Sequence, residues 1–454
     1  MTFMGRYLGS EKYGVFMLAL NIVTIFEMFT DFGLRDISVR NVAQQKNLIE
    51  KYIGNLLIWK ILLSCIVMLV LIGIANLLGY DSNIKLIIYV LAPSAFLKNL
   101  KYTMRIFLQV HNRFAWDAFL VFIERACLLG IGLALLFQFK AVLPLAVCFT
   151  LVRFVDFLLI LFIIRWKIAP IKFKLDFHFM TKLQLEALPL GLFFVVLTIY
   201  SYIDTVMLSL MRNIGDVGMY NSAFKIYEGI TILPTVFWLV VLPRLSELFA
   251  KNLEHHKRLA IRSIKYMFVI GIPILIYGII LSKYIVTFFY GDEYLPAVLV
   301  LQILFIGIVF EFVNWMLNAA LISMNRQKIL LILGSTGLMF KIILNLILIK
   351  LYGYYGSSVT TALGELLIFI IAFSYLFKHL NGMPVHSIIL KPIFAGGIAY
   401  LVYYILILCD LPILLILCCL GLVYIVGLFA LKTFDNHELK IFFQNTFLKK
   451  NRIV

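Results

Sequence analysis

The chain has few charged residues, and those it has are mostly basic. Of its 454 residues, 14% are charged and 63% are hydrophobic, against about 25% and 45–50% in soluble domains. Its six cysteines and seven histidines lack the spacing of a metal site, and no Walker A, HExxH or GxSxG pattern occurs. The composition excludes a soluble domain. We therefore predict a protein that is not an enzyme, with no catalytic residues, no metal site and no cofactor.

Apolar runs long enough to cross a bilayer fill most of the chain. A helix needs about 20 apolar residues to span the hydrocarbon core. The sequence therefore predicts an all-α polytopic membrane protein with about thirteen transmembrane helices. The predicted spans are 14–34, 52–79, 84–110, 117–138, 142–164, 185–211, 219–242, 265–288, 296–321, 329–350, 356–377, 388–408 and 412–432.

Basic residues are distributed unevenly between the connections. A net charge of +17 would indicate nucleic-acid binding in a soluble protein, but here we expect no nucleic acid, because basic loops on the cytoplasmic side are the simpler explanation. One alternating set of connections holds 22 Lys and Arg residues and the opposite set holds four. By the positive-inside rule the first set is cytoplasmic. The prediction is a multi-pass protein of the inner, cytoplasmic membrane with its C-terminus inside.

A degenerate repeat divides the chain. The segment 6–14 contains RYLGS and a YG pair, and 212–220 returns with RNIGD and GMY, 206 residues later. We expect two related lobes, parallel repeats with the substrate path between them. The predicted boundaries are 1–184 for the N-lobe, 185–387 for the C-lobe and 388–454 for two additional helices with a basic cytoplasmic tail.

The repeat also predicts a missing element. The span at 185–211 precedes the second motif copy, and shifting it back by 206 residues places it ahead of Met1. We therefore expect that the N-lobe lacks the first of fourteen ancestral helices. The alternative is a genuine thirteen-span protein with an exported N-terminus.

Ionisable residues inside the spans are the candidate functional residues. A charge at the centre of a transmembrane helix costs about 2.5–3.5 kcal/mol, so most of them must face protein partners or a hydrated cavity. Those well inside the runs are Glu27, Lys60, Lys98, Lys101, Glu124, Arg125, Arg153, Asp156, Asp204, Lys225, Glu228, Glu311, Lys341 and Glu365.

Their spacing leads to more specific expectations. Lys98, Lys101 and Arg105 form one cationic stripe at helical spacing, which an anionic substrate group such as a pyrophosphate would suit. The alternative is that this end of the helix reaches the surface and its side chains snorkel to lipid headgroups. The pairs Lys225 with Glu228 and Arg153 with Asp156 can each bridge within one helix. Asp204, Glu311, Lys341 and Glu365 have no near partner on their own helices, which marks them as functional candidates.

A set of short motifs resembles a known family. They are RYLG and YG at 6–14, DFGL at 31–34, Arg40, DTVML at 204–208, LPRLS at 242–246, YGDEYLPA at 290–297, NRQK at 325–328, Asn345, and YG at 352–353 with Gly356. In this order and spacing the chain resembles the Wzx-type O-antigen and capsule flippases of the polysaccharide transport family. That family is similar in fold to the multidrug and toxic-compound exporters, with two six-helix lobes around a central cavity and two further C-terminal helices.

The resemblance implies translocation of an undecaprenyl-pyrophosphate-linked oligosaccharide by alternating access. The implied partners are that lipid-linked oligosaccharide, the lipid bilayer, and the polysaccharide polymerase and chain-length machinery. Energy would come from a Na+ or H+ gradient or the membrane potential. A lipid II flippase and a multidrug exporter remain alternatives. We expect the substrate cavity to be lined by Lys98, Lys101, Arg125, Arg153, Lys225 and Lys341. Gating or cation coupling would fall to Asp31, Asp156, Asp204, Glu228, Glu311 and Glu365.

Overall fold

The computed structural model describes residues 2–44, 48–168, 174–380, 384–409 and 411–434, and this part of the chain is helical, without β-strands. The predicted cytoplasmic tail lies mostly outside the described residues, beyond residue 434. The first seven helices are α1 (Thr2–Asp31), α2 (Leu34–Gln44), α3 (Ile49–Leu77), α4 (Ser82–Val110), α5 (Phe114–Phe139), α6 (Val142–Lys167) and α7 (Phe177–Met211).

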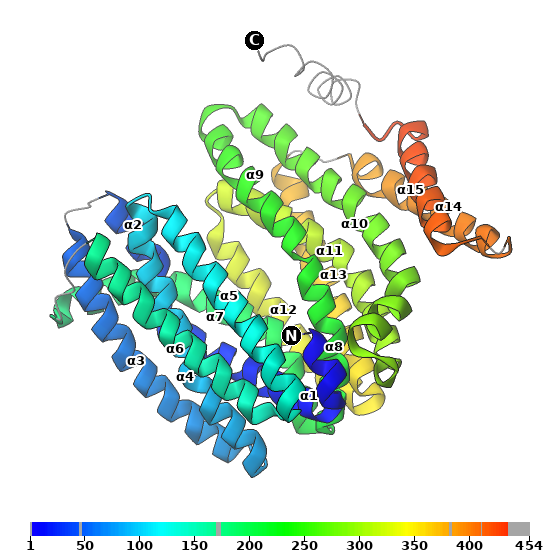
Figure 1. Ribbon diagram of the computed structural model, residues 1–454. Coiled ribbons are helices and arrows are strands. Elements are labelled where there is room, and N and C mark those ends of the chain that lie inside the picture. Colours follow the sequence, from blue (N-terminus) through cyan, green and yellow to red (C-terminus); the bar gives the residue numbers. More distant parts are fainter. Residues whose placement is uncertain (1, 45–47, 169–173, 381–383, 410, 435–454) are drawn as a thin grey trace, which may run out of the picture. The chain divides into compact units, whose positions relative to one another are not determined.

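The later part of the chain continues with long helices (Figure 1). They are α8 (Ile214–Ile230), α9 (Ile232–Lys251), α10 (Leu253–Tyr290), α11 (Ala297–Ser323), α12 (Gln327–Tyr352), α13 (Tyr354–His379), α14 (Lys391–Ile407) and α15 (Ile413–Ala430), with short helical turns η2 (Asp292–Tyr294) and η3 (His386–Leu390).

Each of the thirteen predicted spans coincides with helix, and the prediction of an all-α polytopic membrane protein is confirmed. Within the described residues, twelve helices are long and apolar enough to cross a bilayer. The predicted span at 84–110 is helix α4, which is not among these twelve. It carries Lys85, Lys98, Lys101 and Arg105, and packs against α1, α3, α5 and α6. Its charges are therefore placed inside a helix bundle.

Several helices differ from the predicted boundaries. The connection at 35–51 contains the additional helix α2. The predicted span at 219–242 divides into α8 and α9 at Thr231, because Pro234 has no N–H to donate to the carbonyl four residues earlier. Helix α10 begins at Leu253 rather than near residue 265, so residues 253–264, which lie in the connection between two predicted spans, continue the helix of the second span.

Helix α1 contains an interruption at Gly9. Its φ of 78° is left-handed, a conformation that glycine adopts without a steric penalty. The break leaves the backbone N–H of Ser10 without a partner in its own helix, and the Glu293 carboxylate accepts it at 2.8 Å. Glu293 thus acts as a cap for the second part of α1, which joins the RYLGS motif to the YGDEY motif.

The chain divides into two compact units. The first unit comprises Met1–Lys225, Ile285–Val300 and Gly334–Thr360, and the second comprises Ile226–Tyr284, Leu301–Leu333 and Thr361–Val454. This division differs from the predicted lobes at 1–184 and 185–387, because its boundaries fall inside α8, α10, α11, α12 and α13. The lobe boundaries stay a prediction.

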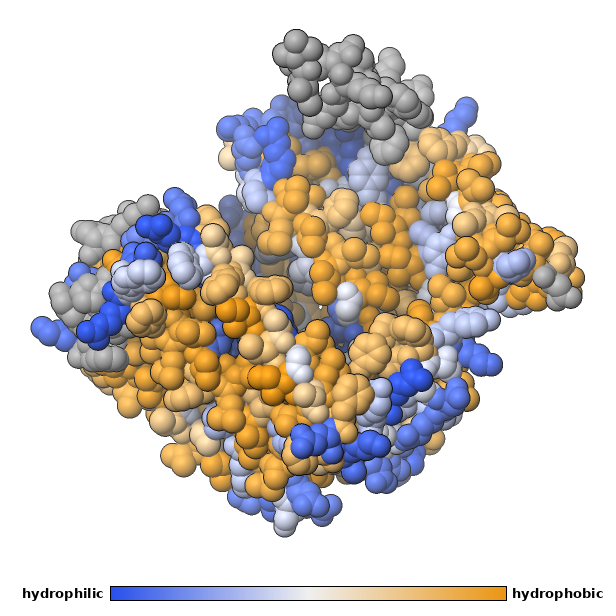
Figure 2. Space-filling view, viewed as in Figure 1, coloured by the Kyte–Doolittle hydropathy of each residue, from blue (hydrophilic) through white to orange (hydrophobic). Residues whose placement is uncertain are grey.

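The apolar core of the first unit lies between its long helices. Leu56 of α3, Phe107 of α4, Ile160 of α6 and Ala187 of α7 are each fully buried in one cluster. In the ribbon view α3, α4, α5 and α6 lie side by side (Figure 1). The space-filling view shows a broad apolar surface over α5 and α6, where large side chains such as Phe122 are exposed (Figure 2). An outward apolar surface around a bundle with buried charges is the arrangement expected in lipid.

Candidate functional site

Basic residues on one face of α4 lie against carboxylates from other helices. Lys98 Nζ is 2.8 Å from Glu27 Oε2 in α1. Arg105 pairs with Asp117 in α5 through two hydrogen bonds, one of them 2.9 Å from Nη2 to Oδ2. The repulsion expected along the cationic stripe is therefore offset by acids of the protein itself. An anionic ligand is not required to neutralise the stripe in this conformation.

Lys101, the central residue of the stripe, lies between two acids. It forms ion pairs with Glu124 of α5 and Asp156 of α6, and all three side chains are almost completely buried. Arg153 of α6 lies 3.7 Å from Glu124 and donates to Ser94 Oγ at 3.1 Å. Arg153 and Asp156, which share one helix face, thus both have partners on other helices.

Lys60 of α3 joins three helices. Its ammonium pairs with Asp31 of α1 and donates to Asn99 at 2.7 Å and to Thr103 at 2.5 Å, both on α4. The Lys60 side chain is only 1% exposed. Asp31, a predicted gating residue, is therefore engaged by a buried lysine that was expected as a charge inside a span but was assigned neither to the cavity nor to gating.

The ring of Tyr102 lies among four cations. The charged groups of Arg35, Lys98, Lys101 and Arg105 lie 5.7, 6.0, 5.9 and 5.2 Å from its centroid. Attraction between cations and an aromatic ring is significant within about 6 Å. Tyr102 thus adds to the stabilisation of positive charge at this point of α4.

These residues form what we call the N-terminal charge network. Moving an ion pair from water into a protein interior has a large desolvation penalty, and removing one partner then leaves a buried charge without compensation. The near balance of acids and bases explains how so many charges can lie within apolar helices. Arg125, predicted as a cavity residue, is exposed on α5 outside the network. The members are Glu27, Asp31, Lys60, Lys98, Lys101, Arg105, Asp117, Glu124, Arg153 and Asp156.

A second buried ion pair joins α7 to α12. Lys341 Nζ lies 2.7 Å from Asp204 Oδ2, and both side chains are 1% exposed. Tyr220 of α8 donates to the same carboxylate at 2.7 Å, and Asn345 of α12 donates to its other oxygen at 2.6 Å. Asp204 and Lys341, for which the sequence spacing gave no oppositely charged neighbour on their own helices, are thus brought together across 137 residues of sequence.

Helix α1 is joined to α7 and α8 by a buried polar contact. Asn21 donates to Thr205 Oγ1 at 2.9 Å and to Asn221 Oδ1 at 3.0 Å. Asn221 in turn donates to Thr205 at 3.1 Å. These neutral side chains carry no charge signal, so a search for ionisable residues in spans passes over Asn21 and Thr205.

The two copies of the repeat pack against each other at glycines. A Cβ on Gly14 would lie 2.1 Å from the carbonyl oxygen of Ile214, and one on Gly218 would lie 2.0 Å from that of Ser10. Gly14 corresponds to Gly218 and Ser10 to Ile214, and each pair is separated by 204 residues. The two motif arginines are separated by 206 residues. The contact is reciprocal, as expected where two copies of one unit meet.

The arginines of the two motif copies both donate hydrogen bonds to backbone carbonyls near the C-terminal end of another helix. Arg6 donates to the carbonyl of Phe288, near the end of α10, at 2.8 Å. Arg212 donates to the carbonyls of Ile349 and Lys350, near the end of α12, at 3.1 and 2.7 Å. A cation at a helix C-terminus satisfies free carbonyls and the helix dipole. This explains why arginine opens both copies.

The remaining predicted site residues are distributed between the two units. In the first unit, Lys225 is half-buried with its ammonium 5.8 Å from the centroid of Tyr202. In the second unit, Asn314 of α11 donates to the Glu365 side chain of α13 at 3.0 Å and to its carbonyl at 3.1 Å.

Glu228 and Glu311, also of the second unit, are half-buried. Within the described residues, no group of three or more His, Cys, Asp and Glu side chains has the geometry of a metal site.

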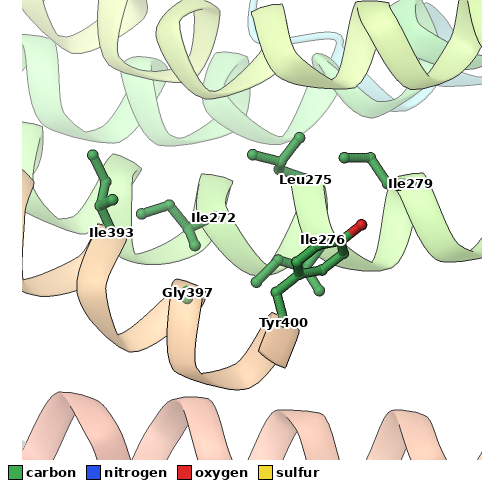
Figure 3. A pocket seen from close by; sticks show the side chains of 8 residues that line it. Ile272, Leu275, Ile276, Ile279, Ile393, Gly397 and Tyr400 are labelled. Carbon is green, nitrogen blue, oxygen red and sulfur yellow. The ribbon is translucent and has the colours of Figure 1, made fainter. Parts of the chain in front are cut away.

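An apolar groove of about 260 Å³ runs between α10 and α14 in the second unit. Ile272, Ile276 and Ile279 of α10 face Ile393, Gly397 and Tyr400 of α14 across it (Figure 3). Gly396 allows the close approach of the helices, because a Cβ there would lie 2.4 Å from an atom of Ile272. The lining can hold hydrocarbon and offers almost no polar partner.

Comparison with protein families finds two matches along the chain. The family model described as "Polysaccharide biosynthesis protein" matches residues 1–249, and the model described as MatE matches residues 189–347. A Shigella flexneri protein named as an O-antigen transporter is 25% identical over 384 residues, which cover 81% of this chain and 90% of that protein. A Haloferax volcanii protein named as a flippase of low-salt glycan biosynthesis, Agl15, is 23% identical over 80% of this chain and 76% of its own length.

Solved structures have the same fold. An inward-closed lipid II flippase MurJ superposes with a TM-score of 0.72 at 20% identity, over 98% of both chains. An inward-facing MATE multidrug resistance transporter superposes with a TM-score of 0.67 at 15% identity, over 84% of this chain and 93% of its own. These likenesses confirm the predicted MATE-like helical architecture.

Proposed function

The chain belongs to the polysaccharide biosynthesis protein family, and on this premise we propose that it is a flippase for an undecaprenyl-pyrophosphate-linked oligosaccharide. The cargo would be an O-antigen, capsule or other surface-polysaccharide repeat unit, carried from the cytoplasmic to the outer leaflet. The observation that carries the proposal is the N-terminal charge network, which holds several buried or half-buried cations among helices apolar enough to span a membrane. A cargo with a pyrophosphate and a polar glycan needs such an environment.

The mechanism we propose is an exchange of partners. In this conformation Lys98, Lys101 and Arg105 of α4 are each bound to a carboxylate. Lys98 is 24% exposed, against 2% for Lys101, so Lys98 is the most accessible point at which a pyrophosphate can replace a carboxylate. Arg105, 16% exposed, is the next, and Arg153 follows at 11%. After the cargo is released, the carboxylates would pair with the basic residues again, which restores the carrier without cargo. Alternating access between the lobes would complete the transport cycle.

The lipid portion of the cargo would stay in the bilayer. The groove between α10 and α14 is apolar, and its volume of about 260 Å³ would hold part of a prenyl chain. We place the protein in the cytoplasmic membrane with a cytoplasmic C-terminus. Polymerase and chain-length proteins are proposed as partners, because the flipped unit is their substrate.

Complementation of an O-antigen flippase-null strain tests the proposal. Lys98→Gln and Arg153→Gln should lower surface glycan, whereas Arg125→Gln, at an exposed position of α5, serves as the matched control. Fluorescent fusions report whether each variant reaches the membrane in equal amount. A variant in which Arg153, Lys225 and Lys341 all lack their charges provides a further test. If it exports glycan at the wild-type level, the proposed role of cationic residues in binding the cargo is refuted.

A lipid II flippase is the second candidate, because the MurJ fold matches over nearly the full length of both chains. The two cargoes share the lipid pyrophosphate, so site chemistry alone does not separate them. Expression in a strain depleted of its lipid II flippase would decide. Restored cell-wall synthesis without surface-glycan rescue favours lipid II. A multidrug exporter is less suited, since a cavity for apolar cations has no use for the bases of α4.

A further inference from the structure

Lys341 occupies a site that has the ligands of a monovalent cation. Its ammonium lies 2.7 Å from a carboxylate oxygen of Asp204 and donates to the backbone carbonyl of Tyr200 at 2.9 Å. The face of the Tyr200 ring is 4.5 Å away. Carboxylate and carbonyl oxygens are the donors that hard cations prefer, and an aromatic face adds to the attraction. The chain thus surrounds a single positive charge with oxygen ligands, deep among helices.

The carboxylate at this site is held in place independently of the lysine. Tyr220 donates to Asp204 Oδ2 at 2.7 Å and Asn345 to Oδ1 at 2.6 Å. Asn345 Oδ1 in turn lies 3.5 Å from the hydroxyl of Ser357 in α13. Four helices therefore fix the oxygens. Removal of the ammonium would leave a preformed anionic cage rather than a collapsed one.

Charge determines what such a cage would do. Asp204 is completely buried, and loss of one partner of a buried ion pair is strongly destabilising. Truncation of the lysine side chain would also provide the space of the missing methylene groups. A small alkali cation supplies the missing charge and accepts the same oxygen ligands.

We infer that Lys341 is a tethered cation filling a monovalent-cation site at Asp204, so that this site binds neither Na+ nor K+ in the native chain. Lys341→Ala would convert it into a Na+ or K+ binding site. This gives Lys341 a role different from the predicted contact with cargo. The inference stands apart from the proposed function, because its test measures cation binding and not transport.

Thermal unfolding of the purified full-length protein in detergent tests the inference. The wild type, Lys341→Ala and the double variant Asp204→Asn/Lys341→Ala are compared in NaCl, KCl and choline chloride at equal ionic strength. Wild type should melt at the same temperature in all three salts. Lys341→Ala should melt lower in choline and rise by about 5 °C or more in one of the alkali salts, increasing with the logarithm of concentration.

The double variant shows whether an effect of cations on melting requires the Asp204 carboxylate or reflects the stability of the fold in general. It removes both charges, so it should fold and melt without dependence on the cation. Cation-dependent melting of the wild type would overturn the inference. So would a Lys341→Ala protein that no alkali cation stabilises, whether it melts identically in all three salts or fails to fold in each of them.

Discussion

Gly14 and Gly218 each lie against a carbonyl oxygen of the other's helix, at positions 204 residues apart in the two copies of one repeat. Only a hydrogen atom fits between these backbones. The crossing holds the second part of α1 against the beginning of α8, and the Asn21, Thr205 and Asn221 hydrogen bonds continue the same contact further along α1.

The glycine crossing predicts a strong effect of a single methyl group. Gly14→Ala and Gly218→Ala should each lower the melting temperature and reduce export, because the added Cβ would lie 2.1 or 2.0 Å from a carbonyl oxygen. Overpacking of this kind costs about 1–3 kcal/mol. Gly229→Ala in α8 is the control, since nothing lies within 4 Å of its Cβ position. Equal melting of the variants at positions 218 and 229 would contradict the close crossing.

The network around Lys101 predicts destabilisation that a second substitution relieves. Lys101→Met leaves Glu124 and Asp156 without their shared cation and should cost about 3–5 kcal/mol, seen as loss of monodisperse protein on size exclusion. Adding Asp156→Asn removes one of the two acids and should restore part of the yield. Arg125→Met, on the exposed side of α5, should behave as wild type. A fully stable Lys101→Met protein would show that the ion pairs do not support the bundle.

The apolar groove predicts a transport defect without a folding defect. A Cβ on Gly397 would meet nothing within 4 Å, so Gly397→Phe should extend its ring into the groove between α10 and α14 while the melting temperature stays unchanged. If the groove holds the lipid chain of the cargo, export should fall severalfold. Gly73→Phe, also in open space but on α3, should export normally. Normal export by both variants would remove the groove from the transport path.

The carboxyl group of Asp176, just before the start of α7 and outside the spans, should make the stability of the first turn of α7 depend on pH. The pKa of its carboxyl is lowered, first by the hydrogen bond from the Phe179 backbone N–H and then by Lys51. Because the folded pKa lies below the unfolded value of about 3.9, its contribution to stability is present at neutral pH. That contribution is lost as the pH falls through the folded pKa.

Hydrogen exchange of the Phe179 amide measures this effect. After correction for intrinsic rates, protection should decrease below about pH 4 in the wild type. Asp176→Asn keeps an acceptor for the cap but cannot titrate, so its protection should vary less with pH. The same pH profile in both proteins would exclude Asp176 as its source.

Much of the fold could be predicted from the sequence, because apolar length alone defines a span. The thirteen predicted spans are helical, and the duplication is visible in packing as well as in motifs. The divided span at Thr231 was harder to predict, because several prolines lie within runs and α10 stays continuous through Pro273.

The partners of the charged residues could not be predicted. Sequence spacing reveals only contacts within one helix, whereas Lys101, Arg153, Asp204 and Lys341 all pair across helices. Neutral polar residues such as Asn21 gave no signal at all. The sequence therefore identified which side chains were costly in lipid, and the structure was needed to show what relieves that cost.

The charges of α4 also bear on how the protein is made. A helix that carries Lys98, Lys101 and Arg105 is poorly suited to enter a bilayer alone. Its neutralising acids lie on α1, before it in the chain, and on α5 and α6, after it. Stable insertion of α4 therefore has to wait until residues as far as Asp156 have been synthesised. The first helices must enter the membrane as a group, and a ribosome stalled between α4 and α6 should leave α4 accessible from the cytoplasm.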